Sequence, residues 1–477
     1  GGVDPGQRPT AGAEEAPGKA ATPRAPGTRN EKTVMTFGPA AEPVVGAEEP
    51  TTEDVPPPRR PFQATVEDLW LEAGALSDGG VAVEGSHYLH AAGALQWQAN
   101  TTWTLRGAVR ADGYAQTGDP SFEHSRLDYG ETYLRYRGEG TRITLGAQKV
   151  LWGRVDEIAP TDRLATPDLR RYVLDGLQDR RLASPALRAE WFGPRYKLDA
   201  VLVPDLREAE LPPSESIWHP LDRVNGEIMG LQPDPVLAAV IQNGTLGADT
   251  DGAGGGGVRI SRTGEKADAA LTIQRMRHLT PYYELDDGVR AGLLAGDPVP
   301  AALANATGAT LMERHPWTTL VGADLGVPIG RNTWRLELAW RSDVPVTAGD
   351  LSMQTAEGVD WVAGVELYPG DGDARLNLQV AGHHLLNPPD GVLDRDETYL
   401  LNGELENNFA RARWRAGLRF FFGLNEKDVY LNPEIAYVGI EPHTFYLGGH
   451  YFDGDAGTPG GFHQDHSLLA LGWRVQY

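Results

Sequence analysis

From about residue 64 to the end of the chain, apolar and polar residues alternate with a period of two. Such alternation predicts β-strands with one apolar and one polar face. The patterned segments run for about 9–13 residues, which is the length that crosses a bilayer, whereas strands in soluble proteins average about 5–6 residues. The clearest examples are 333–341, 374–380, 411–422 and 468–477. The pattern therefore predicts membrane-spanning strands.

The connections between these strands alternate between short turns and longer loops. Short turns are expected near 98–101, 138–141, 193–196, 263–266, 328–332, 369–373, 406–411 and 438–442. Short periplasmic and long extracellular connections are typical of outer-membrane barrels. Eight turns and nine loops connect eighteen strands, and sixteen is the alternative because the first strand, 66–76, has the weakest pattern. We therefore expect an all-β, antiparallel up-and-down transmembrane β-barrel over 62–477, with both termini in the periplasm of a Gram-negative bacterium.

The last strand, LLALGWRVQY, ends on an aromatic residue and carries apolar residues at alternate positions. These residues are Leu469, Leu471, Trp473, Val475 and Tyr477. The arrangement resembles the C-terminal signal that the barrel assembly machinery reads in outer-membrane barrels, and the alternative is an ordinary edge strand that ends the chain. We expect this machinery and outer-membrane lipid to be partners of the protein.

Residues 1–61 differ from the rest in being rich in Pro, Ala, Gly and Glu and poor in aromatic residues. Such a composition predicts a disordered periplasmic tail. The alternative is a segment that becomes ordered on a periplasmic or lumenal protein partner. The chain opens on GGVDPGQRPT, without a basic and apolar leader, so we expect a processed N-terminus.

Charge and composition exclude several classes of function. The net charge is -23, of which residues 1–61 carry -2, and this acidity argues against nucleic-acid binding. The mean hydropathy is -0.38 and no apolar run of about 18 residues predicts a membrane helix. The absence of cysteine excludes a lipid-anchored N-terminal Cys and covalent haem attachment. No motif points to catalysis, a metal or a cofactor, so we predict none of these.

A distinctive pattern surrounds the third predicted loop. A strand ending in Gly146-x-Gln148-x-Val150-x-Trp152-Gly153 is followed by Asp156, Pro160-Thr161-Asp162, Pro167-Asp168-Leu169 and Asp179-Arg180-Arg181. Over 131–193 this pattern resembles a family of proteobacterial, porin-like outer-membrane barrels of unknown function. That family commonly has Asn before the Pro–Asp pair, where this chain has Thr166. The resemblance implies the fold and the location, and it implies no reaction.

The third loop also carries the densest set of charges. Thr166, Pro167 and Asp168 form a helix-start pattern, and a helix over 167–181 would have one apolar stripe. Because such a stripe needs a wall to lie on, we hypothesise that the loop folds inward and narrows the lumen. The alternative is a structural cap held together by Asp–Arg pairs. The candidate constriction residues are Asp156, Glu157, Asp162, Arg163, Asp168, Arg170, Arg171, Asp175, Asp179, Arg180 and Arg181.

A second set of candidate pore-lining residues is an arginine row. It consists of Arg411, Arg413, Arg415 and Arg419, which period-two spacing places on one face. Trp414 and Phe420 assign the other face to lipid, so the row is expected to point inward. One interpretation is an anion-attracting ladder in the pore, and the alternative is an Arg–carboxylate network that stiffens the wall. Further charges expected in the interior are Glu131, Arg135, Arg137, Arg335, Glu337 and Arg375.

The function predicted from these patterns is a channel that passes small solutes through a polar lumen, since a barrel of this size leaves an aqueous channel unless something fills it. The alternative is a scaffold barrel that holds a protein partner in an envelope complex, with residues 1–61 contributing to docking. An enzyme is not expected. Segments 222–242 and 285–305, rich in Ala, Leu and Val, are expected to form short helices in the extracellular loops.

Overall fold

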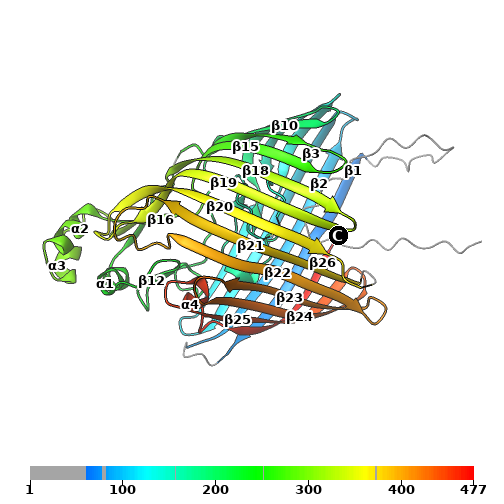
Figure 1. The fold of residues 1–477 in the computed structure, drawn as a ribbon. Coiled ribbons are helices and arrows are strands. Elements are labelled where there is room, and N and C mark those ends of the chain that lie inside the picture. Colours follow the sequence, from blue (N-terminus) through cyan, green and yellow to red (C-terminus); the bar gives the residue numbers. More distant parts are fainter. Residues whose placement is uncertain (1–60, 78–81, 156, 251, 371–372) are drawn as a thin grey trace, which may run out of the picture. The chain divides into compact units, whose positions relative to one another are not determined.

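Nineteen strands form one continuous sheet in the computed structural model (Figure 1). The structure describes residues 61–77, 82–155, 157–250, 252–370 and 373–477, so the predicted tail lies outside the described residues except for Pro61. The strands of this sheet are β1 (Phe62–Leu76), β2 (Val83–Gln98), β3 (Trp103–Gly118), β4 (Phe122–Tyr129), β5 (Thr132–Gly138), β6 (Thr141–Gln148), β9 (Ser184–Phe192), β10 (Tyr196–Val203), β14 (Gly255–Arg262), β15 (Asp268–Arg277), β18 (Trp317–Ile329), β19 (Asn332–Thr347), β20 (Met353–Leu367), β21 (Ala374–Leu386), β22 (Glu397–Phe409), β23 (Trp414–Gly423), β24 (Asp428–Ile440), β25 (His443–Gly454) and β26 (Leu468–Gln476). β4 and β5 both pair with β3 and form one barrel strand, which gives the eighteen strands that were predicted.

Pairing between the first and last strands closes the barrel. β1 pairs with β26 from Asp68 opposite Gln476 to Leu76 opposite Leu468, in antiparallel register. A short turn follows every second strand, close to each position predicted. The start of β1 and the end of β26 lie at the end of the barrel that carries these turns, and the long loops lie at the opposite end (Figure 1).

The wall has one irregular place, at β4. Among the described residues, β4 pairs only with β3, because β6 ends at Gln148 and the chain leaves the wall to form the third loop. Two ion pairs link β4 to the fourth loop, which connects β10 to β14, in place of backbone pairing. They join Arg126 to Glu210 and Asp128 to Arg207.

The outward face of the barrel is apolar and exposed. On β15, Leu271 and Ile273 are 62% and 54% exposed, whereas the alternating Thr272 and Gln274 are 3% and 1% exposed. A soluble sheet has the reverse arrangement, with its apolar face packed on the core. Apolar surface on this scale is stable only against lipid. Among the helices of the described residues, none is long and apolar enough to cross a membrane.

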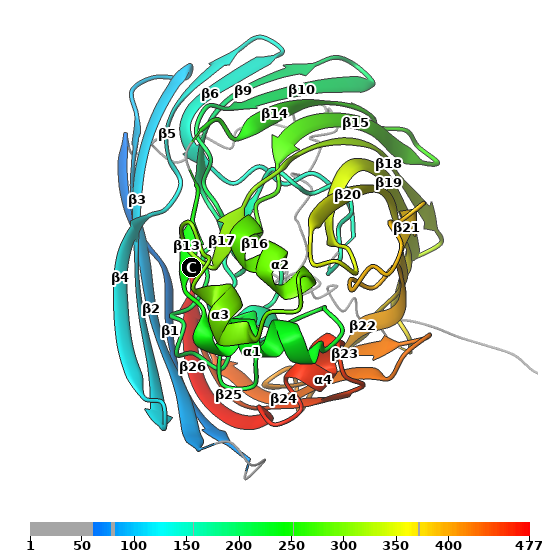
Figure 2. The same cartoon turned by 90° about the vertical axis from the view of Figure 1, so that its left-hand side faces the viewer.

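Beyond the wall, the fourth loop and the fifth loop, which connects β15 to β18, build a small cap. The cap overlies the ring of strands in Figure 2. Its elements are α1 (Pro235–Asn243), β13 (Leu246–Ala248), β16 (Tyr282–Leu285), α2 (Asp287–Leu294), α3 (Val299–Leu303) and β17 (Leu311–Arg314). Asp234 and Asp286 cap the two longer helices by accepting hydrogen bonds from backbone amides at 2.8–3.1 Å. Val240, Val289 and Leu311 are buried in the core of the cap. The expected loop helices are thus present: α2 and α3 lie within the predicted 285–305, and α1 ends one residue beyond the predicted 222–242.

The helix predicted over 167–181 is wrong. The segment contains only the 3-10 turn η1 (Tyr172–Leu174), between the short paired strands β7 (Thr166–Pro167) and β8 (Arg181–Leu182). Thr166 therefore pairs with Leu182 instead of starting a helix, and Tyr172 has a left-handed φ of 47°. The other small elements are β11 (Leu221–Asp222), β12 (Glu227–Ile228) and α4 (Pro459–Phe462).

Candidate functional site: the barrel interior

The third loop, 149–183, contacts inward-facing side chains of strands that are far apart around the ring. Near its start, the amide of Val155 donates to Glu337 of β19 at 2.9 Å. Near its middle, Arg171 donates to Glu72 of β1 at 2.7 Å. β1 and β19 lie on nearly opposite sides of the ring, so these contacts join the loop to both sides of the wall.

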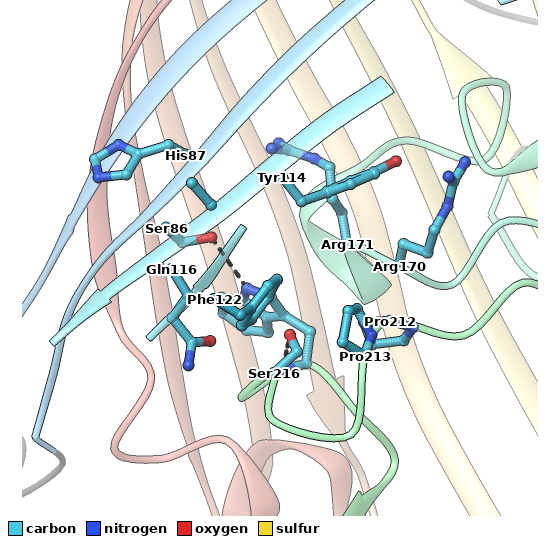
Figure 3. A pocket seen from close by; sticks show the side chains of 12 residues that line it. Ser86, His87, Tyr114, Gln116, Phe122, Arg170, Arg171, Pro212, Pro213 and Ser216 are labelled. Carbon is cyan, nitrogen blue, oxygen red and sulfur yellow. Dashed lines mark hydrogen bonds between the residues drawn. The ribbon is translucent and has the colours of Figure 1, made fainter. Parts of the chain in front are cut away.

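Residues 204–220 of the fourth loop pack on the third loop from the side of the long loops. The amide of Leu169 donates to the carbonyl of Glu210 at 2.9 Å. Between the two loops a cavity of about 10 Å³ remains beside Arg170 and Arg171, which has room for a single water molecule (Figure 3). Its other lining residues include Ser86, Tyr114, Gln116, Pro212, Pro213 and Trp218. The two loops are therefore packed closely here.

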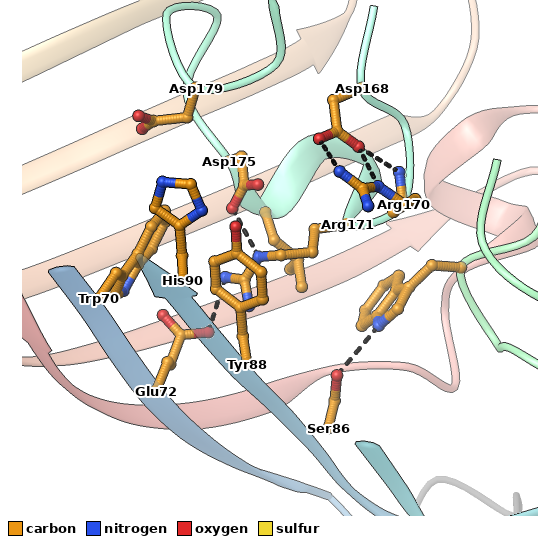
Figure 4. Close-up of polar contacts among 12 residues, drawn as sticks. Trp70, Glu72, Ser86, Tyr88, His90, Asp168, Arg170, Arg171, Asp175 and Asp179 are labelled. Atoms are coloured by element: carbon orange, nitrogen blue, oxygen red, sulfur yellow. Dashed lines mark hydrogen bonds and ion pairs between the residues drawn. The ribbon is translucent and has the colours of Figure 1, made fainter. Parts of the chain in front are cut away.

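Arg171, a predicted constriction residue, joins the third loop to β1 (Figure 4). Its guanidinium donates to Asp175 and to Glu72, both at 2.7 Å. It also lies over the rings of Tyr88 and Trp70, at 4.3 and 4.9 Å from their centres, which adds cation–π attraction. Burial raises the pKa of the Asp175 carboxyl, and Arg171 opposes this shift. One buried cation thus balances two buried carboxylates.

Arg170 forms a second connection between the third loop and the wall, at β3. Its guanidinium binds both carboxylate oxygens of Asp168, at 2.8 and 2.6 Å, and reaches Asp112 of β3 at 3.3 Å. It lies 4.9 Å from the ring centre of Tyr114, and Asp112 also contacts Nδ1 of His90 at 2.7 Å. Bidentate Arg–carboxylate bonds are geometrically specific, so Asp168 orients Arg170 within the loop, and the bond to Asp112 joins the loop to the wall.

Two strand arginines hold the rest of the loop. Arg474 of β26 donates to Asp179 at 2.9 Å and to Asp68 of β1 at 2.5 Å. Arg419 of β23, one of the predicted arginine row, donates to the carbonyls of Asp175 at 3.0 Å and Leu174 at 3.1 Å. Arg419 therefore binds backbone carbonyls of the third loop, and its role in the pore stays a prediction.

The remaining predicted loop residues form ion pairs with one another or with β20. These pairs are Arg181 with Asp162, Arg180 with Glu157 at 3.2 Å, and Arg163 with Asp360 of β20 at 3.8 Å. Asp156 lies outside the described residues. These ion pairs fit the alternative in which Asp–Arg pairs hold the third loop together. The role of the loop in conduction stays a prediction.

A second charged network lines β19 to β24 near the end that carries the short turns. Its ion pairs are Arg335–Glu366 at 2.8 Å, Arg375–Glu366 at 2.7 Å, Arg375–Glu404 at 3.4 Å and Arg415–Glu434 at 3.2 Å. Charges of opposite sign alternate along the wall, so Arg415 belongs to an Arg–carboxylate network and not to a row of like charges.

The predicted arginine row is wrong in its extent. Arg411 and Arg413 lie exposed in the turn between β22 and β23, and β23 begins only at Trp414. Three consecutive residues of this turn have left-handed φ angles, namely Ala410 at 51°, Arg411 at 62° and Ala412 at 56°. Extended alternation cannot continue through such backbone, so the four arginines do not share one strand face.

The C-terminal residues are arranged mostly as the strand pattern predicts. Leu469 and Leu471 are exposed on the outward face, and Tyr477 is exposed at the end of the chain. Trp473 is half-buried and Val475 is buried. Recognition of these residues by the assembly machinery stays a prediction.

Some strand residues that hold the third loop were missed from the sequence, whereas Glu337 and Arg419 were predicted to face the interior. Glu72, Asp112 and Arg474 each alternate with outward-facing neighbours, and this parity was the available signal. Parity assigns them to the interior, but it does not say which loop residue each one meets. That information comes only from the register of strands that are distant in the sequence.

No protein-family model and no curated protein matches the chain. Solved structures that match include OmpF of Salmonella typhi in complex with daunomycin, at 9% identity, 87% of this chain, 97% of that chain and a TM-score of 0.43. OpdL of Pseudomonas aeruginosa matches at 11% identity over 87% of this chain and 98% of that chain, with a TM-score of 0.46. OccAB4 of Acinetobacter baumannii matches at 8% identity over 87% and 97%, with a TM-score of 0.46. The strand pairing and the apolar belt, rather than these likenesses, define the chain as a closed transmembrane β-barrel.

Proposed function

We propose that this barrel is a channel of the Gram-negative outer membrane that passes small polar solutes through a lumen narrowed by its third loop. The observation that carries the proposal is the attachment of 149–183 to inward-facing side chains of β1, β3, β19, β23 and β26. An eighteen-stranded wall encloses space for water unless that space is filled. A loop tied across this space would set its width.

The charged network on β19 to β24 supports passage of polar rather than apolar solutes. Arg335, Arg375 and Arg415 alternate there with glutamates along the wall. Fixed charges lining a pore set its ion selectivity. We further propose that the short turns, the start of β1 and the end of β26 face the periplasm, and that Leu469 and Leu471 contact lipid.

Electrical recording in planar bilayers tests the proposal. The wild-type protein should insert and give discrete ion-conducting steps. A variant whose residues 154–180 are replaced by a short Gly-Ser linker should give larger steps, because the wall stays intact while the crossing segment is removed. Absence of current from both proteins, with the folded barrel verified by circular dichroism, would overturn the channel. A stoichiometric protein partner that co-purifies with such a silent barrel would instead favour the scaffold function.

A further inference from the structure

Three side chains from separate parts of the chain meet beside the cap. Glu208 lies in the fourth loop, Glu313 lies on β17, and His315 lies between β17 and β18. One carboxylate oxygen of each glutamate and a ring nitrogen of His315 all lie within 4.8 Å of one another. Nε2 of His315 is 3.0 Å from Oε2 of Glu208. The cluster is thus already close to the size of a metal-binding site.

The hydrogen bond at the other ring nitrogen orients His315. Nδ1 lies 2.8 Å from the carbonyl oxygen of His278, and because a carbonyl only accepts, Nδ1 carries the proton. In the neutral ring, Nε2 is then unprotonated and lies 3.0 Å from the carboxylate oxygen of Glu208. Two acceptors 3.0 Å apart repel each other unless a cation or a proton lies between them. This backbone contact is the one that typically orients metal-binding histidines.

Within the described part of the chain, these two atoms lie close to each other without a hydrogen bond to any group. The His315 side chain is fully buried, yet its Nε2 and the Oε2 of Glu208 have no hydrogen bond of acceptable geometry. Among the described residues, no arginine or lysine forms an ion pair with Glu208 or Glu313. A buried ring nitrogen that lies close to two carboxylates, without a hydrogen bond of acceptable geometry, is a group that a cation would satisfy.

The backbone around the three residues holds them in place. The amide of Ala209 donates to the carbonyl of Leu279 at 2.8 Å, which fixes the segment that carries Glu208. The amide of His278 donates to the carbonyl of Pro316 at 2.9 Å, and Glu313 is paired with Tyr283 of β16. The cluster therefore needs only small side-chain movements to bind an ion.

We propose that Glu208, Glu313 and His315 bind a divalent transition-metal ion of the zinc class. One imidazole and two carboxylates suit zinc, whereas magnesium and calcium prefer oxygen ligands alone. Ligands about 2.0–2.1 Å from a tetrahedral zinc are about 3.4 Å apart, close to the observed Glu208–His315 separation. Glu208 also lines a cavity of about 270 Å³ beside β4.

The ion would connect the cap to the third loop. Glu313 belongs to the sheet of the cap. Glu208 lies two residues before Glu210, whose backbone forms a β-bridge with Asp168 of the third loop. Leu169 donates to the carbonyl of the same Glu210 at 2.9 Å. Metal binding would therefore stiffen the chain from the cap to the loop that crosses the barrel.

Zinc titration of the refolded, lipopolysaccharide-free barrel tests the site, since lipopolysaccharide phosphates themselves bind divalent ions. After chelator treatment, calorimetry should show one zinc ion bound per chain. The variants His315→Gln and Glu208→Gln should each weaken binding by about tenfold or more. Glu284→Gln serves as the matched control, because Glu284 lies on the adjacent strand β16 and pairs with Arg314 at 2.6 Å instead.

Two results would overturn the metal site. The first is wild-type protein that binds no zinc at neutral pH, which would mean that a proton on His315 occupies the group. The second is equal zinc affinity in Glu208→Gln and Glu284→Gln, which would place the ion elsewhere. Glu208 is 38% exposed at its side chain, so its variant is expected to fold even if His315→Gln does not. Both readouts are independent of conduction and of the proposed channel.

Discussion

Replacing Arg171 by Met tests how the third loop is held. The side chain is 5% exposed and bonds to Glu72 and Asp175 at 2.7 Å each. Methionine keeps apolar contact with Trp70 and Tyr88 but removes the charge, which leaves two buried carboxylates without this partner. Breaking a buried ion pair in this way costs about 3–5 kcal/mol.

The lower end of that range applies, because Glu72 keeps its hydrogen bond from Tyr446 at 2.5 Å. A cost of about 3 kcal/mol changes the ratio of detached to attached loop by about 150-fold. We therefore expect Arg171→Met to raise the single-channel conductance in planar bilayers, or the time spent in its largest open state. The free energy of unfolding in urea should fall by a similar amount.

The control is Arg290→Met on the cap. Arg290 pairs with Asp287 and Asp350 at 3.4 and 3.3 Å, and the side chain of Asp287 is 93% exposed. We therefore expect Arg290→Met to lower the free energy of unfolding by less than about 1 kcal/mol. Adding Glu72→Gln to Arg171→Met should restore part of the lost stability, because the double variant removes one of the uncompensated charges. A folded Arg171→Met barrel with wild-type conductance and open time would refute the proposed narrowing by the loop.

Three further predictions concern the wall, the loops and the pore charge. Leu471→Arg on the outward face should lower the free energy of unfolding in liposomes by about 2–4 kcal/mol, whereas Leu424→Arg, in an exposed loop, should change it little; equal effects would contradict the lipid-facing assignment. Burial raises the pKa of Asp394 to about 6, above the unfolded value of about 3.9, so the contribution of its carboxyl to stability is complete at low pH and is lost as the pH rises through 6. Melting temperatures of Asp394→Asn and wild type should therefore diverge between pH 4 and pH 6, and a constant difference would disprove the shift. Arg375→Gln removes a cation from beside Glu366 and Glu404 and should move the reversal potential toward cation selectivity; an unchanged potential would exclude this network from the conducting path.

The strand framework was predictable because one periodicity and one parity rule determine it. Alternation along β1 is enough to place Glu72 inside the barrel and Leu71 outside. The even number of strands brings Tyr477 to the same end of the barrel as the start of β1. The same rule fails at Arg411 and Arg413, where left-handed backbone ends the alternation without a glycine to signal it.

The interior was less predictable because its contacts join residues that are distant in the sequence. Thr166 looks like a helix cap locally, but pairing with Leu182 gives it an extended backbone. The acids and arginines of the third loop were visible as candidates, whereas their partners depend on which strands face the loop. Glu208, Glu313 and His315 share no sequence motif at all, so only the folded chain brings them together.

The half-unpaired strand β4 sets how deeply the barrel sits in its membrane. The hydrocarbon layer offers no partners to backbone amides and carbonyls, so a free strand edge is not stable within it. The lipid boundary on this side must therefore lie near Gly130, where pairing of the neighbouring wall ends. The eight residues of β4 then extend along the strand for about 26 Å, or about 20 Å above the boundary at a typical tilt. In the proposed orientation, the β3–β4 hairpin would therefore stand in the headgroup and sugar layer, accessible to antibodies and phage from outside the cell.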